Sequence, residues 1–134
     1  MRRRGTEKMR STFSRDWKAS RQPRKQRKYL KNAPLHIRQR LIHATMSKEL
    51  RKKFGKRSVG VRKGDKVKVM RGEFVGKVGK VNLVDRKRQG VYIDGIERNR
   101  RDGAKAFVRI HSSNVMVMEF SSEDKARQKG LKRK

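Results

Sequence analysis

The side chains best suited to chemistry in this sequence are basic residues spaced by glycines, within residues 64–81. Arg71, Lys77 and Lys80 carry positive charge, and Arg and Lys are the usual protein partners of phosphate. The glycines among them are Gly72, Gly76 and Gly79. Glycine permits positive φ and lets a backbone come close to a ligand. The combination predicts a loop that contacts the phosphates of a nucleic acid.

Further basic residues gather in four places: an N-terminal arm, two expected helices, the segment that follows them, and an expected hairpin tip. The candidate phosphate-binding residues there are Arg24, Lys25, Arg27, Lys28, Arg38, Arg40, Arg51, Lys52, Lys53, Lys56, Arg57, Arg86, Lys87 and Arg88. A polyanion neutralises several of them at once, which favours phosphate contact for the set. For any single arginine the alternative is a solvated helix face.

Three aromatic side chains are candidates for stacking on bases. Phe74 lies at the tip of the glycine-rich loop, where it either joins the hydrophobic core or stacks on an unpaired base. The core is favoured, because buried aromatic residues outnumber stacking ones. Trp17 and Tyr29 are candidate base stackers, because an arm offers them no other shelter.

No residue set indicates catalysis. The chain has three histidines, His36, His43 and His111, which are scattered, and it has no cysteine. The carboxylates Asp94 and Glu97 are near each other in sequence, but such a pair among many basic residues is more often a charge-balancing contact. No glycine-rich loop precedes a Lys-Ser or Lys-Thr pair. We expect no enzyme activity, metal, cofactor or small-molecule substrate.

Short alternating segments predict the strands that must position the loop. Val67 and Val69 alternate with Lys66 and Lys68, the period of a half-buried strand. The expected strands are Lys66 to Met70, Val78 to Asp85, Val91 to Asp94, Ala106 to His111 and Val115 to Phe120. Five short strands at this spacing predict a mainly β fold, a small barrel resembling the SH3-like fold, over residues 59–120.

Two short helices are expected over residues 32–58, ahead of the barrel. The first covers about residues 34–44, with Asn32 as a cap and Pro34 in the first turn. Ser47 is an N-cap for the second, which ends at Gly55. Leu50 and Phe54 are one turn apart on it and should dock together on the barrel or on the first helix.

The charge balance indicates what surrounds these elements. The chain has 42 Lys and Arg against 12 Asp and Glu, a net charge of +30, of which residues 1–58 hold +18. We expect residues 1–31 to be an extended basic arm that folds against nucleic acid, and residues 121–134 to be a basic tail. The sequence has no stretch of about 18 apolar residues, so it predicts no membrane span. The basic N-terminus lacks the apolar run of a secretory signal.

The glycine-rich segment resembles the KOW motif, a hydrophobic strand followed by a basic loop that ends in Gly-Lys-x-Gly, here residues 76–79. The longer run over residues 47–81 resembles the universal large-ribosomal-subunit protein family twenty-four, in its archaeal and eukaryotic form. Residues 32–38 and 110–115 are similar to the same family, so the resemblance covers about residues 20–118. The chain departs from it at Ser112, where relatives often carry proline, and in its short C-terminal tail.

This resemblance implies a structural, cytoplasmic protein of the large ribosomal subunit. It implies binding to large-subunit ribosomal RNA near the 5′ domain and close to the exit of the nascent-peptide tunnel, with a role in subunit assembly and translation. The implied partners are this RNA, neighbouring large-subunit proteins and factors that dock at the tunnel exit.

Two alternatives share the KOW motif or the charge. A transcription elongation factor should carry an αβ domain ahead of the barrel, where this chain has a basic arm and short helices. A DNA-compacting protein would use the same charge, and a preference for duplex DNA over structured RNA would favour it.

Overall fold

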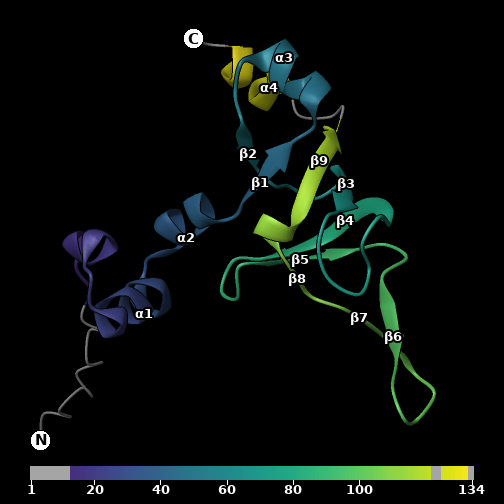
Figure 1. Ribbon diagram of the computed structural model, residues 1–134, viewed down its shortest axis with the longest axis horizontal. Coiled ribbons are helices and arrows are strands. Elements are labelled where there is room, and N and C mark those ends of the chain that lie inside the picture. The colour runs from purple at the N-terminus through teal and green to yellow at the C-terminus, as the bar shows by residue number, and fades with distance from the viewer. Residues whose placement is uncertain (1–12, 122–124, 133–134) are drawn as a thin grey trace, which may run out of the picture.

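The centre of the computed structural model, which describes residues 13–121 and 125–132, is a seven-stranded sheet (Figure 1). The strands run in the order β2-β1-β9-β3-β4-β5-β8. Their bounds are β1 His43–Met46, β2 Ser58–Gly60, β3 Lys66–Val69, β4 Val78–Asp85, β5 Gly90–Ile93, β8 Ile110–His111 and β9 Val115–Glu119. Neighbours are antiparallel, except that β1 runs parallel to β9. The prediction of a mainly β, SH3-like KOW fold is confirmed.

The core is formed by the inward face of these strands. Val67 and Val69 are buried and alternate with the less buried Lys66 and Lys68, as the pattern predicted. The largest buried apolar side chains around them are Met46, Val81, Val91, Ile93, Ile96, Val115 and Val117. Full burial of one such side chain contributes about 1.5–3 kcal/mol.

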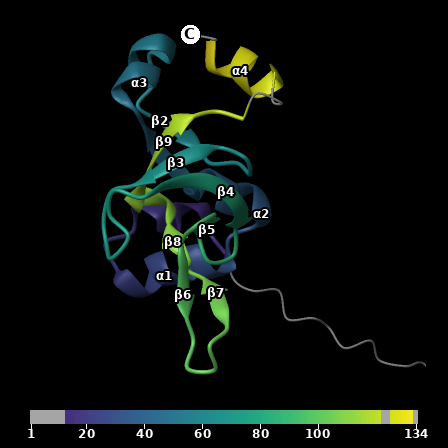
Figure 2. The same cartoon turned by 90° about the vertical axis from the view of Figure 1, so that its right-hand side faces the viewer.

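The fourth predicted strand, residues 106–111, is wrong as a single element. It is divided into β7, Lys105–Phe107, and β8, because these pair with different partners. β8 joins β5, whereas β7 pairs with β6, Glu97–Asn99, in a separate hairpin that projects from the barrel (Figure 2). The amide of Val108 donates to the carbonyl of Ile96 at 3.2 Å and closes the base of this hairpin.

The first predicted helix is too long. Helix α2 is Leu35–Leu41, Pro34 is its N-cap residue, and Asn32 does not cap it. The residues after it form β1, because Thr45 and Met46 pair with Met116 and Val117 of β9. Strand β2 was not predicted either, and it pairs with β1.

The second predicted helix is confirmed as α3, Lys48–Phe54. The hydroxyl of Ser47 accepts a hydrogen bond from the amide of Leu50 at 3.3 Å, which caps the helix. Gly55 ends it with a φ of 64°. Leu50 and Phe54 pack against the main core, as expected.

The prediction of an extended arm is wrong over its described part. Residues 15–19 form the 3₁₀ helix η1, Arg15–Ala19, and residues 23–32 form helix α1, Pro23–Asn32. Tyr29, Ala33 and Ile37 are buried in a second hydrophobic cluster, apart from the main core. Phe13 and Trp17 pack against it, and the rings of Phe13 and Tyr29 stack with centroids 5.3 Å apart. This cluster stabilises helix α1. Residues 1–12 of the predicted arm lie outside the described residues.

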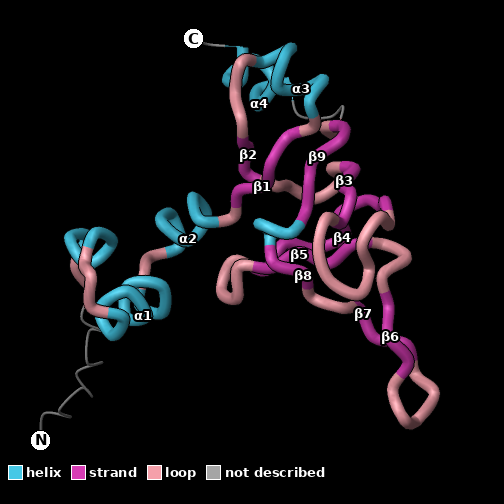
Figure 3. The backbone as a smooth tube through the Cα atoms, in the orientation of Figure 1, coloured by secondary structure: helices cyan, strands magenta, loops and turns pink. Residues whose placement is uncertain are grey.

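The described part of the predicted C-terminal tail is also folded. Residues 125–132 form helix α4, Lys125–Lys132, which lies beside α3 at one end of the sheet (Figures 1 and 2). Its Leu131 is buried in the main core. The ammonium of Lys56 donates to the carbonyl of Gly130 at 3.3 Å. The helices therefore lie in two groups, with α1 and α2 on one side of the strands and α3 with α4 at the end (Figure 3).

Candidate nucleic-acid interface

The KOW loop, residues 70–77 between β3 and β4, is held by its own backbone. The amide of Gly76 donates to the carbonyl of Val69, and the amide of Val69 donates to the carbonyl of Lys77, both at 2.9 Å. Gly72 and Gly76 have φ of 98° and 84°, values that L side chains rarely adopt. The loop is therefore fixed in shape, and Arg71 and Lys77 are exposed on it.

Phe74 is in the position that the sequence favoured. It is half-buried and packs against the main core, and the ammonium of Lys77 lies 5.0 Å from the centre of its ring. Its neighbour Glu73 forms an ion pair with Arg98 of β6. The loop tip is thus tied to the core and to the β6–β7 hairpin.

Gly79 has a different structural role from the other two glycines. A Cβ atom there would lie 2.5 Å from the carbonyl oxygen of Asp94 and 2.7 Å from Cγ2 of Ile93. The residue is glycine because β5 occupies this space, so close approach to RNA is not what requires it.

Lys80 lies apart from the loop arginine. It is exposed on β4, opposite Lys66 of β3 in the strand register. Lys63, Lys66 and Lys80 line one hollow, whereas Arg71 lines another. Arg71 and Lys80, both predicted for the KOW region, therefore line separate hollows.

The turn between β4 and β5 presents Arg86, Lys87 and Arg88, all exposed. The carboxylate of Asp85 accepts hydrogen bonds from the amides of Lys87 and Arg88 at 2.9 and 3.1 Å. The guanidinium of Arg109 donates to the carbonyl of Arg88 at 2.7 Å. These hydrogen bonds fix the shape of the basic turn, and it lies at the hairpin tip that the sequence predicted.

Most of the candidate residues on the helices are exposed. They are Arg24, Lys25, Arg27 and Lys28 on α1, Arg40 on α2, Lys52 and Lys53 on α3, and Lys56 and Arg57 after it. Arg38 and Arg51 are half-buried instead. Arg38 donates to the carbonyl of Lys31, and Arg51 donates to the carbonyl of Met46 at 2.8 Å. These two guanidinium groups are therefore held by hydrogen bonds within the fold.

Of the two aromatic residues proposed as base stackers in the arm, Tyr29 is buried and Trp17 is half-buried. Tyr29 is 8% exposed, and Trp17 packs on the cluster that contains it. The interpretation that they lack other shelter is wrong, because Ala33 and Ile37 provide it.

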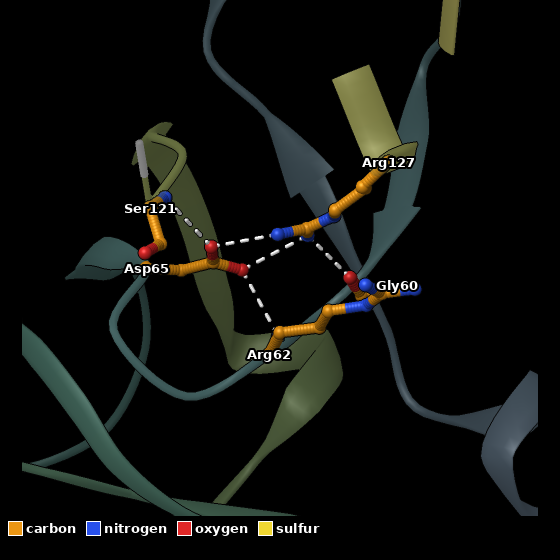
Figure 4. A network of polar contacts seen from close by, with 5 residues as sticks. All are labelled: Gly60, Arg62, Asp65, Ser121 and Arg127. Carbon is orange, nitrogen blue, oxygen red and sulfur yellow. Dashed lines mark hydrogen bonds and ion pairs between the residues drawn. The ribbon is translucent and has the colours of Figure 1, made fainter. Parts of the chain in front are cut away.

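A buried ion pair was missed in the sequence (Figure 4). The guanidinium of Arg127 donates to both carboxylate oxygens of Asp65, at 2.7 and 2.9 Å, and to the carbonyl of Gly60 at 2.5 Å. The same carboxylate accepts from the amides of Arg62 and Ser121 at 2.9 and 3.2 Å. Asp65, between Gly64 and Lys66, was the available signal in the sequence, because a lone acidic residue in a basic segment indicates a specific partner for its carboxylate.

Neither a metal site nor a membrane span is found in the described part of the chain. No group of three or more His, Asp or Glu side chains within residues 13–121 and 125–132 could hold a metal ion. None of the helices in these same residues has the length and apolar character needed to cross a membrane.

The barrel, its fixed KOW loop and the exposed basic side chains define a class of protein, a small SH3-like module of the kind found in nucleic-acid machinery. Residues 20–134 match the family described as the eukaryotic ribosomal proteins L26 and their archaeal L24 counterparts. The chain belongs to this family, which is structural and not enzymatic.

Two curated archaeal relatives carry the name large ribosomal subunit protein uL24. That of Korarchaeum cryptofilum (strain OPF8) is 47% identical over 115 residues, which cover 86% of this chain and 88% of the relative. That of Methanothrix thermoacetophila (strain DSM 6194) is 51% identical over 110 residues, 82% of this chain and 95% of the relative. The predicted family is confirmed, and so is the prediction that the chain is not an enzyme.

Proposed function

We propose that this chain is a cytoplasmic structural constituent of the large ribosomal subunit that binds large-subunit ribosomal RNA and supports subunit assembly and translation. Its site lies near the 5′ domain of that RNA and close to the exit of the nascent-peptide tunnel. Neighbouring large-subunit proteins, and factors that dock at the tunnel exit, are its further partners. Family membership supports the ribosomal part of this proposal.

The RNA-binding part rests on one observation, the fixed KOW loop that exposes Arg71 and Lys77. A loop closed by backbone hydrogen bonds holds its basic side chains in place before binding, which lowers the entropic cost of association. The exposed residues of α1, α3 and the β4–β5 turn extend this contact over other faces of the molecule. Phosphate contacts of this kind fix position and contribute most of the affinity.

Binding titrations over a range of salt concentrations test the proposal. The probes are deproteinised archaeal large-subunit ribosomal RNA and a DNA duplex of random sequence. If about ten phosphates are neutralised, the slope of log K against log salt should be roughly −7 to −9. We expect tighter binding to the ribosomal RNA at every salt concentration. Equal or tighter binding to the duplex would contradict the proposal and favour a DNA-compacting protein.

A further inference from the structure

A hollow lies between the end of α2, the segment after β2 and strand β4. It has a volume of about 340 Å³, within the roughly 300–1,000 Å³ range typical of ligand pockets. Its apolar wall includes Ile42, Val61 and Leu83. Leu83 is 58% exposed, although it is an aliphatic residue in the middle of a strand.

Polar groups of two kinds surround this apolar wall. Arg62, Lys63 and Arg86 are exposed at the hollow, and they come from two separate segments of the chain. Asn82 and Gln39 add side-chain amides, each of which offers both a hydrogen-bond donor and an acceptor. Of these five residues, only Arg86 is among the candidate phosphate-binding residues identified from the sequence.

A second hollow, of about 400 Å³, adjoins the first and shares Gln39, Val61 and Arg62 with it. It adds Arg40, His36 and His43 to the basic character of the surface. Among the described residues that line the two hollows, none is Asp or Glu. Two other hollows, at the KOW loop and beside Lys80, each contain a glutamate.

We propose that these two adjoining hollows form a groove that takes one unpaired nucleotide of the bound RNA. This inference rests on the RNA binding proposed above. The base lies against Leu83 and Val61, and the amides of Asn82 and Gln39 face its polar edge. The phosphates on either side lie on Arg62, Lys63 and Arg86. Three features fit a nucleotide: an apolar wall for the base, amides for its edge, and a rim without carboxylates for its phosphates.

The first test compares two leucines with the same exposure. Leu83→Ser removes the apolar contact to the base, and Leu35→Ser is the control, because both leucines are 58% exposed and Leu35 lines neither hollow. Removal of this apolar contact should weaken binding to archaeal large-subunit ribosomal RNA about five-fold or more. The salt slope should not change, because Leu83 contacts no phosphate. Leu35→Ser should bind as the unmodified chain does.

The second test compares two triple substitutions of equal charge. Arg62, Lys63 and Arg86 are replaced by Gln in one variant. The control replaces Arg100, Arg101 and Lys105, exposed residues of the β6–β7 hairpin and its turn. The groove variant should lower the magnitude of the salt slope by about 1.4, since two phosphates flank the nucleotide and each phosphate neutralised on single-stranded RNA contributes about 0.7. The control should change it less.

Ultraviolet crosslinking of the unmodified chain to the same RNA, with the attached peptides identified by mass spectrometry, does not depend on any variant. A nucleotide attached within residues 61–63 or 82–86 is expected. Crosslinks to residues 70–77 without any in the groove would overturn the inference. Unchanged RNA binding by both groove variants would overturn it too, and would favour an acidic protein segment as the occupant. In either case the unmodified chain still binds RNA, so the proposed function stands; failure of the unmodified chain to bind would remove both.

Discussion

Asp65 and Arg127 form a buried ion pair that joins the start of the barrel to the C-terminal helix. The side chain of Asp65 is fully buried and that of Arg127 is 6% exposed. They are 62 residues apart in sequence, and the pair also holds the carbonyl of Gly60 in β2 and the amide of Ser121 after β9. One basic residue of the expected tail is therefore part of the interior.

We predict that Arg127→Met lowers the free energy of unfolding by about 3–5 kcal/mol, because it leaves the Asp65 carboxylate buried without its counter-ion. Urea unfolding followed by circular dichroism measures this. The double variant Asp65→Asn, Arg127→Met should be less destabilised than the single one, because no charge remains unpaired.

A surface ion pair is the control for this substitution. Lys66 and Glu119 lie 3.0 Å apart, with side chains 45% and 67% exposed. Lys66→Met should therefore change the free energy of unfolding by less than about 1 kcal/mol. An equally small effect of Arg127→Met would contradict the structural role assigned to the buried pair.

We predict that Gly79→Ala destabilises the barrel. The added methyl group would meet the carbonyl oxygen of Asp94, just after β5, at 2.5 Å and Cγ2 of Ile93 in β5 at 2.7 Å, so strands β4 and β5 must separate locally. Overpacking of this kind costs about 1–3 kcal/mol. Gly130→Ala is the opposite case, because Gly130 is helical with open space around it, and it should stabilise the chain by about 0.5–1 kcal/mol. Thermal unfolding of both variants measures the difference; equal stability would show that β5 does not restrict residue 79.

We predict that simultaneous replacement of Arg71, Lys77 and Lys80 by alanine weakens RNA binding without unfolding the barrel, because all three side chains are exposed. The magnitude of the salt slope should fall by about 2–3. Titration with archaeal large-subunit ribosomal RNA measures this, and the circular dichroism spectrum reports the fold. Unchanged affinity would exclude the KOW loop from the interface.

We predict that deletion of residues 1–33 leaves the barrel folded and impairs incorporation into large subunits. The aromatic side chains that are lost pack in the second cluster and not in the main core, so the thermal midpoint of the barrel should change little. The cut follows α1, which ends at Asn32, so that no partial helix remains. Quantitation of the truncated chain in purified large subunits measures incorporation, and a normal level would mean that residues 1–33 are not needed for it.

The barrel was predictable because its strands carry local patterns. Strand β4 has the predicted bounds, Val78–Asp85, and the alternation of Val67 and Val69 fixed the inward face of β3. The caps of α3, Ser47 and Gly55, also act through neighbouring residues alone. In each case a few adjacent residues determine the conformation.

The missed features depend on residues far apart in sequence. The segment of β1 is a strand because β9 pairs with it, and no pattern within four residues shows a parallel partner 71 positions away at Met116. Helix α1 has little apolar surface of its own, and it is stabilised by a cluster that Tyr29 shares with Ala33 and Ile37. The spacing of four between these residues was the available signal. Arg127 resembles the other basic residues of the tail until the carboxylate of Asp65 is seen beside it.

The most direct test of the central claim is sedimentation of the tagged chain from its native cells through a sucrose gradient at moderate salt, followed by RNA crosslinking of the fractions. We predict that the chain sediments with large ribosomal subunits and crosslinks to their ribosomal RNA near its 5′ domain, through residues of the KOW loop. Sedimentation with RNA polymerase or with bulk DNA, without ribosomal RNA crosslinks, would contradict this account.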